Sequence, residues 1–204
     1  MNKEYSQLGQ DTWILEKTNY KKNGFFVEIG AHDGKHLSNT YILEKEHNWS
    51  GICAECNPET IPQLMNNRNC SIETRALIHR NNLNVPFYSN KSPTLSQVFL
   101  YAEVRSTDTD EIINPQHVVK TVDINTMLRD HNAPIDIDYI SIDTEGTELF
   151  IATVFDFVKY NVKYWTVEVN GDLTAANYLR RFFYYHGYES EQREWDLFIW
   201  KQYD

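Results

Sequence analysis

The sequence predicts a doubly wound α/β fold whose sheet is mostly parallel and has an antiparallel last strand. Apolar runs of strand length alternate with amphipathic stretches along most of the chain. This alternation is typical of a parallel sheet with helices on both faces. The last two apolar runs are joined by the short link 193–196, which permits an antiparallel hairpin and excludes a crossover.

The expected strands are short runs rich in branched and aromatic residues. In chain order they lie at residues 25–29, 51–55, 71–78, 85–88, 118–122, 138–142, 164–169, 188–192 and 197–201. In open sheets of this kind, ligands bind beyond the carboxyl ends of the strands. The residues that follow each strand are therefore the informative ones for function.

Helices are expected between these strands, at residues 38–47, from 57 onward, 124–131, 147–159 and 173–186. Three helix ends carry local signals. Ser38 is a candidate N-cap, Pro58 is expected near the first turn of its helix, and Gly187 can end the last helix.

The length of 204 residues predicts one domain, 1–204, with a full core. Residues 1–23 are expected to pack on this core as an N-terminal segment. Residues 89–116 are polar, irregular and long. A loop of that length is usually functional or disordered, and we expect a substrate or lid loop there.

The composition is that of an ordinary globular protein, with 41% hydrophobic and 24% charged residues. The formal net charge of -10 repels phosphate backbones, so a nucleic-acid partner is not expected. No stretch approaches the roughly 20 apolar residues that span a bilayer, and the start of the chain lacks the apolar region of a signal peptide. We therefore expect no membrane partner and a cytoplasmic location; the sequence does not indicate the oligomeric state.

The three cysteines do not suggest a disulfide framework. Cys53 and Cys56 have the spacing of a zinc or redox pair, but the chain has no second such pair. We interpret them as structural thiols in a reducing compartment.

The stretch "GFFVEIGAHDG" at residues 24–34 joins the first strand to a glycine-rich turn. Glycine lets the backbone turn sharply and approach a ligand closely. After the second strand comes Glu55, an acid placed to hold the two hydroxyls of a ribose. The pattern predicts an adenosine-containing ligand.

That ligand is not expected to be NAD. The dinucleotide fingerprint G-x-G-x-x-G has a middle glycine, where this chain has His32. Glu28 and Asp33 would also repel a pyrophosphate. S-adenosylmethionine carries a sulfonium and an ammonium group, and acids around the turn suit that positive charge.

Four stretches together resemble the FkbM-type methyltransferases, within the class I S-adenosylmethionine-dependent enzymes. They read "YSQLGQDTWIL" from residue 5, "FFVEIGAHDGKHLSNTYILE" from 25, "GICAECNPE" from 51 and "IDYISIDTEGTELFIA" from 137. The order matches the family over most of the chain. One departure is Cys56 after Glu55, where the family often has proline. The resemblance implies a Rossmann-like class I methyltransferase sheet of seven strands with an antiparallel last strand.

The resemblance and the strand-end rule together give a candidate cofactor site. Its residues are Gln10, Glu28, Gly30, Ala31, Asp33, Gly34, Ser38, Asn39, Glu55, Cys56, Asn57, Ala76 and Asp143. Some alternatives stay open. Glu28 and Asp33 either organise the loop or meet the methionine ammonium; Ser38 is otherwise a simple N-cap, and Glu55 a solvated strand end. Gln7 and Gln10 either close over the cofactor or cap the domain.

A second group of polar residues follows the strands at 138–142 and 164–169. Asp143, Glu168 and Asn170 resemble by position the ligands of metal-dependent O-methyltransferases, and oxygen ligands suit Mg²⁺ or Mn²⁺. The alternative is that Asp143 contacts the cofactor and Glu168 is only a strand-end acid. Asp143, Glu145 and His32 are the candidate catalytic bases.

The expected function is S-adenosylmethionine-dependent O-methylation of a carbohydrate hydroxyl, such as that of a deoxyhexose like rhamnose, or of a small natural product. A divalent cation is expected to assist. Two alternatives belong to other classes: an NAD-dependent oxidoreductase, and a non-catalytic partner domain that kept the fold.

Overall fold

The computed structural model describes residues 5–88, 97–98 and 115–202. Its main sheet has seven strands in the order β10-β11-β9-β8-β1-β2-β3. They are β1 (Phe25–Ile29), β2 (Ser50–Ala54), β3 (Ser71–Glu73), β8 (Asp136–Ile142), β9 (Asn161–Glu168), β10 (Tyr188–Arg193) and β11 (Asp196–Lys201). The strands from β9 to β3 pair in parallel, and β11 runs antiparallel between β9 and β10. The predicted mostly parallel sheet with an antiparallel last strand is confirmed.

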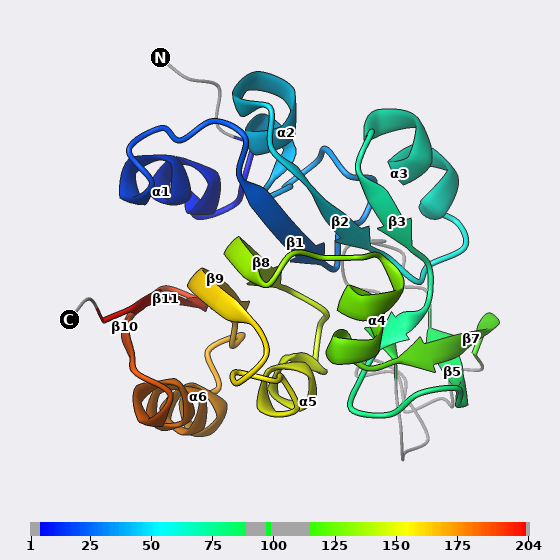
Figure 1. The fold of residues 1–204 in the computed structure, drawn as a ribbon. Helices are drawn as coiled ribbons and strands as arrows, with labels where there is room; N and C mark the ends of the chain where they lie inside the picture. Colours follow the sequence, from blue (N-terminus) through cyan, green and yellow to red (C-terminus); the bar gives the residue numbers. More distant parts are fainter. Residues whose placement is uncertain (1–4, 89–96, 99–114, 203–204) are drawn as a thin grey trace.

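Helices cover both faces of this sheet (Figure 1). One face carries α1 (Gln10–Lys17), α2 (Tyr41–His47) and α3 (Ile61–Asn67), and the other carries α4 (Ile124–Asp130), α5 (Glu148–Thr153) and α6 (Leu173–Tyr185). Successive side chains of a strand point to opposite faces. Phe26 of β1 accordingly belongs to the core under α1–α3, and its neighbour Val27 to the core under α4–α6.

A second, smaller sheet has the strand order β4-β7-β5-β6. Its strands are β4 (Ala76–Leu77), β5 (Asn84–Tyr88), β6 (Gln97–Val98) and β7 (His117–Val122). The expectation of one strand over 71–78 is therefore wrong, because β3 ends in the main sheet and β4 pairs with β7. The chain bends between them where the Glu73 carboxylate accepts hydrogen bonds from the backbone and guanidinium of Arg75. The predicted loop at 89–116 lies mostly outside the described residues.

Three predicted helix ends need correction. The helix expected from 38 begins at Tyr41, and Ser38 lies in the preceding turn. The next helix begins at Ile61, with Pro62 rather than Pro58 in its first turn. The helix expected to run to residue 159 ends at Thr153, since Asp156 accepts backbone hydrogen bonds that form a turn beyond it.

Among the described residues, no helix has the length and apolar character needed to cross a membrane. Cys53, Cys56 and Cys70 are free thiols, and Cys53 is buried.

Candidate functional site

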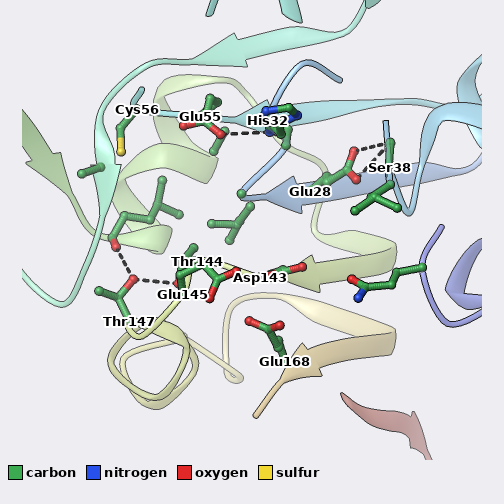
Figure 2. Close-up of a pocket in the computed structure, with 18 of the residues that line it drawn as sticks. Glu28, His32, Ser38, Glu55, Cys56, Asp143, Thr144, Glu145, Thr147 and Glu168 are labelled. Carbon is green, nitrogen blue, oxygen red and sulfur yellow. Dashed lines mark hydrogen bonds between the residues drawn. The ribbon is translucent and has the colours of Figure 1, made fainter. Parts of the chain in front are cut away.

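A cavity of about 370 Å³ lies beyond the carboxyl ends of β1, β2, β8 and β9. The chain order of the strands reverses between β1 and β8, and such a switch point is where α/β sheets bind ligands. The volume falls in the range of small-molecule sites. Figure 2 shows Cys56 and Glu55 toward one end of the cavity, and Glu28 and Ser38 toward the other.

Gly30 brings the end of β1 against the end of β8. Its φ is +89°, and a Cβ built there would lie 1.6 Å from the backbone oxygen of Asp143. The Gly30 and Ala31 amides both donate to the carbonyl of Ala54. Glycine is thus needed at position 30 because the ends of β1, β2 and β8 meet there. Gly30 also lines the cavity.

Glu28 is buried at the end of β1 and organises the loop that follows. Its carboxylate accepts hydrogen bonds from the hydroxyls of Ser38 and Thr40. It also accepts from the backbone amide of Asn39 at 2.7 Å and from the guanidinium of Arg68 at 3.0 Å. A buried carboxylate needs such partners. Glu28 also lines the cavity, and its many donors favour the loop-organising role over direct contact with an ammonium group.

Several residues expected in the cofactor site are not part of the cavity wall. They are Gln10, Asp33, Gly34, Asn39 and Asn57. Asp33 accepts hydrogen bonds from the backbone of Lys35 and His36. A Cβ at Gly34 would meet Leu64 at 2.5 Å. Asp33 and Gly34 therefore shape the turn after β1 by local hydrogen bonds and by packing.

Two more of these residues form hydrogen bonds away from the cavity. The side-chain amide of Asn39 donates a hydrogen bond to the hydroxyl of Ser141. Asn57 is buried, and its side-chain oxygen accepts from the Glu59 amide. Asn39 therefore ties the loop after β1 to β8, and Asn57 braces the turn after β2.

Glu55 stands at the end of β2 and faces the cavity. Its carboxylate accepts from the backbone amides of Asn57 at 2.7 Å and His32 at 2.9 Å (Figure 2). Burial raises the pKa of Glu55, and these backbone hydrogen bonds only partly oppose that shift. Each carboxylate oxygen has further acceptor capacity, which ribose hydroxyls could use.

His32 has two buried ring nitrogens without a hydrogen-bond partner in the described part of the chain. Burial lowers the pKa of this imidazole, and the nearby Asp33 partly opposes the effect. The ring is therefore neutral near pH 7. An unpartnered neutral histidine in a cavity wall suits either a ligand contact or proton acceptance.

Three acids gather where β8 and β9 end. One carboxylate oxygen from each of Asp143, Glu145 and Glu168 lies within 4.8 Å of the others. Figure 2 shows these three side chains along the cavity. Burial raises the pKa of Asp143 to about 7, with the charges of Asp196 and Glu145 adding to it. Burial and the charge of Asp143 raise the pKa of Glu168 to about 10. The cluster strongly resists full ionisation.

Asn170 lies beside these acids, but its amide nitrogen is the atom that faces them. It donates to Glu168 at 3.0 Å and to Glu145 at 3.3 Å. Of the expected trio, Asp143 and Glu168 converge with Glu145, whereas Asn170 presents its NH₂ group to these acids rather than a ligand oxygen.

The turn after β8 is held by Glu148, the first residue of α5. Its carboxylate accepts from the amides of Thr144 and Gly146. The Thr147 hydroxyl donates to the carbonyl of Leu77 (Figure 2). The turn that carries Asp143 and Glu145 is therefore tied to the small sheet.

Left-handed backbone conformations occur repeatedly around the cavity. His32, Leu37, Glu145 and Asn170 have φ values between +45° and +59°, and all four line the cavity. Such conformations are costly for residues with a Cβ, and they cluster at functional sites.

Several other residues that line the cavity were not predicted: Arg75, Leu77, Phe87, Thr144, Thr147 and Trp195. Arg75 is held by Glu73 and Asp130 at 2.6 and 2.9 Å. These residues belong to the small sheet, the β8 turn and the last hairpin. No motif marks them, and the only available signal was the position of Thr144 and Trp195 near strand ends.

The seven-stranded sheet and the cavity at its switch point define a Rossmann-like methyltransferase fold. Residues 28–190 match the model of the methyltransferase FkbM domain. The chain therefore belongs to the FkbM methyltransferase family, as the four sequence stretches predict. Membership implies S-adenosylmethionine as the methyl donor.

Solved structures with a similar fold are also methyltransferases. The METTL16 methyltransferase domain matches with a TM-score of 0.52 and 12% identity, over 95% of this chain and 66% of that one. The human methyltransferase 10 domain containing protein matches with a TM-score of 0.50 and 11% identity, over 97% of this chain and 82% of that one. Precorrin-6y C5,15-methyltransferase from Geobacter metallireducens GS-15 matches with a TM-score of 0.48 and 14% identity, over 94% of this chain and 87% of that one. At these identities the similarity concerns the fold alone. No curated protein matches the chain.

Proposed function

We propose that this chain transfers the methyl group of S-adenosylmethionine to a hydroxyl of a carbohydrate or small natural product. The observation that carries the proposal is one cavity with a ribose-type acid, Glu55, toward one end and the cluster of Asp143, Glu145 and Glu168 beside it. A donor and an acceptor could therefore meet in one cavity.

The residues of the cavity fit the donor. Glu55 is placed to accept hydrogen bonds from ribose hydroxyls, and Cys56 and Ala76 to border the adenine. The free nitrogens of His32 offer a further polar contact. The surrounding acids favour a ligand that carries positive charge and disfavour the pyrophosphate of NAD.

The acceptor side favours a polyhydroxylated molecule. Carboxylates accept hydrogen bonds from several hydroxyls at once, and Trp195, which is 47% exposed, offers an aromatic face at the same cavity. Together with the family resemblance, this supports a sugar such as a deoxyhexose. The net charge of -10 supports a glycan or small molecule over nucleic acid. A cytoplasmic location stays a prediction.

The chain has two tasks in this reaction. It must align the acceptor oxygen behind the methyl group and accept the proton of the hydroxyl. His32 is neutral because its pKa is lowered, and is therefore able to accept a proton near pH 7. Asp143 and Glu145 are the other candidate bases, since both line the cavity.

The acid cluster fits a divalent cation, because three carboxylate oxygens converge and oxygen donors suit Mg²⁺ and Mn²⁺. Asp143, Glu145 and Glu168 would hold it, and Asn170 is adjacent. A cation bound there would lower the pKa of a nearby hydroxyl.

The direct test is release of S-adenosylhomocysteine from S-adenosylmethionine in the presence of a panel of sugars and small hydroxylated compounds. We expect release that depends on an acceptor of this class. The absence of turnover with every acceptor, together with donor binding, would instead support the non-catalytic alternative. Tight binding of NAD without binding of S-adenosylmethionine would support the oxidoreductase.

A further inference from the structure

We propose that residues 5–10, which precede the family-matched region, complete the donor site, and that Gln7 binds the α-carboxylate of the methyl donor. Gln7 lines the cavity, whereas the matched region begins at residue 28. The inference rests on the proposed function, because it takes S-adenosylmethionine as the ligand.

The segment on both sides of Gln7 is held in place. Ser6 forms a parallel β-bridge with Leu37, in the loop after β1. The buried carboxylate of Asp11 accepts from the Ser6 hydroxyl at 2.6 Å and from the Tyr5 amide at 2.8 Å. Gln10, also buried, donates to Asp196 of β11 at 2.7 Å. Gln7 therefore lies on a fixed piece of backbone rather than on a loose terminus.

These anchors place Gln7 at the cavity end opposite the ribose acid. Leu37 follows β1, and Asp196 begins β11, which lies beyond β8 and β9 in the sheet. Glu55 directly follows β2, on the other side of β1. If Glu55 holds the ribose, the adenine extends toward Cys56 and the amino-acid end extends toward Gln7.

The charges of the cavity explain why an amide is needed there. The lining acids can accept hydrogen bonds from the donor's ammonium group but repel its carboxylate. Ser38 already donates its hydroxyl hydrogen to Glu28. Gln7 is exposed, and its amide has no hydrogen bond to the described part of the chain. An uncharged NH₂ group at this point supplies donors to a carboxylate.

The test compares two ligands that differ only at the amino-acid end of the molecule. S-adenosylhomocysteine carries the α-amino acid, and 5′-methylthioadenosine lacks it. Calorimetry on the full chain measures both affinities in wild type and in Gln7→Ala. We expect Gln7→Ala to weaken S-adenosylhomocysteine about tenfold, the order expected for a hydrogen bond to a charged group, and to leave 5′-methylthioadenosine unchanged.

Two further variants sharpen the comparison. Gln63→Ala removes an exposed glutamine of α3 that does not line the cavity, and should change neither affinity. Gln7→Glu places a negative charge toward the carboxylate, and should weaken S-adenosylhomocysteine more than Gln7→Ala does. A folded Gln7→Ala that binds both ligands normally, or loses both equally, would overturn the inference. A wild type that binds neither S-adenosylhomocysteine nor S-adenosylmethionine would overturn the proposed function itself.

Discussion

Glu55 combines two tasks, since its carboxylate braces two backbone amides and also faces the cavity. We predict that Glu55→Ala weakens S-adenosylmethionine binding by roughly 1–3 kcal/mol, because ribose hydroxyls lose a charged partner. Glu55→Gln keeps one oxygen for the backbone and should show the ligand effect with less disturbance of the turn. Calorimetry measures both, with the exposed Glu46→Ala as control. Unchanged affinity in both folded variants would remove Glu55 from the site.

Gly30 allows a second test, for which Gly171 is a matched control. A Cβ at Gly30 meets a backbone oxygen at 1.6 Å, whereas a Cβ at Gly171 meets nothing within 4 Å, although both residues have positive φ. Gly171→Ala should cost only about 1–2 kcal/mol, for the left-handed backbone. Gly30→Ala should cost clearly more in urea unfolding, or prevent folding, because β1 and β8 must separate. Equal costs would contradict the close approach seen here.

The strand-end rule locates the acids of this site but not its other walls. Glu55, Asp143 and Glu168 follow or end strands, and all three line the cavity. Phe87 and Trp195 reach the same cavity from the small sheet and the hairpin. Their positions depend on the packing of segments that are far apart in the sequence. Local patterns in a single sequence do not predict which of these segments come together.

Asp138, near the start of β8, joins three segments at the sheet edge opposite the cavity. Its carboxylate accepts from Lys21, from the Phe25 amide of β1 and from Lys163 of β9. Burial alone would raise the pKa of Asp138, but these donors outweigh burial and lower it below 3.8. A carboxyl whose pKa is lower in the folded state stabilises the fold at neutral pH, and this contribution is lost as the pH falls through the folded-state pKa.

We therefore predict that Asp138→Asn destabilises the protein by roughly 1–3 kcal/mol at pH 7. The difference from wild type should shrink below about pH 4, where the wild-type carboxyl begins to lose its charge. Chemical unfolding at several pH values measures the difference. Asp136→Asn, at the exposed start of the same strand, should have a small effect throughout. A cost for Asp138→Asn that does not vary with pH would show that the charge is not responsible.

Strands and helices were predicted well where apolar periodicity determines the element. Helix ends were predicted poorly where side-chain hydrogen bonds to the backbone determine where the helix begins or ends. All strands of the main sheet were expected, although 71–78 divides between two sheets. Helix ends shifted where Ser38 and Asp156 bind neighbouring backbone amides. Such local bonds compete with helix hydrogen bonds, and apolar periodicity does not report them.

For the molecule as a whole, strand alternation and one short link predicted a mostly parallel main sheet with an antiparallel last strand. Its seven strands were implied by the family resemblance, and their order was not predicted. The small sheet was not predicted, because β4 has only two residues and pairs with β7, about 40 positions later. Its position next to the cavity explains how Arg75 and Phe87 reach the site. The outer strand β10 is rich in charged residues, which disfavours pairing with another sheet edge.

The last prediction is that methyl transfer requires a divalent cation at the acid cluster. Asp143, Glu145 and Glu168 converge from β8 and β9, and positive charge would offset the mutual repulsion of these acids. We expect EDTA to abolish methyl transfer while S-adenosylmethionine binding survives, and added Mg²⁺ or Mn²⁺ to restore transfer. Chelation therefore separates catalysis from donor binding.

Variants of the cluster should rank by the charge that each removes. Asn170→Ala should raise the metal concentration needed for half-maximal activity, because a neutral neighbour of the acids is lost. Glu145→Gln should raise it further, since it removes one of the three converging carboxylates, whereas the exposed Glu46→Gln should leave it unchanged. Full activity after dialysis against EDTA would exclude the cation. Asp143, Glu145 or His32 would then act as a metal-free base, with proton removal contributing about 10²–10⁴-fold to the rate.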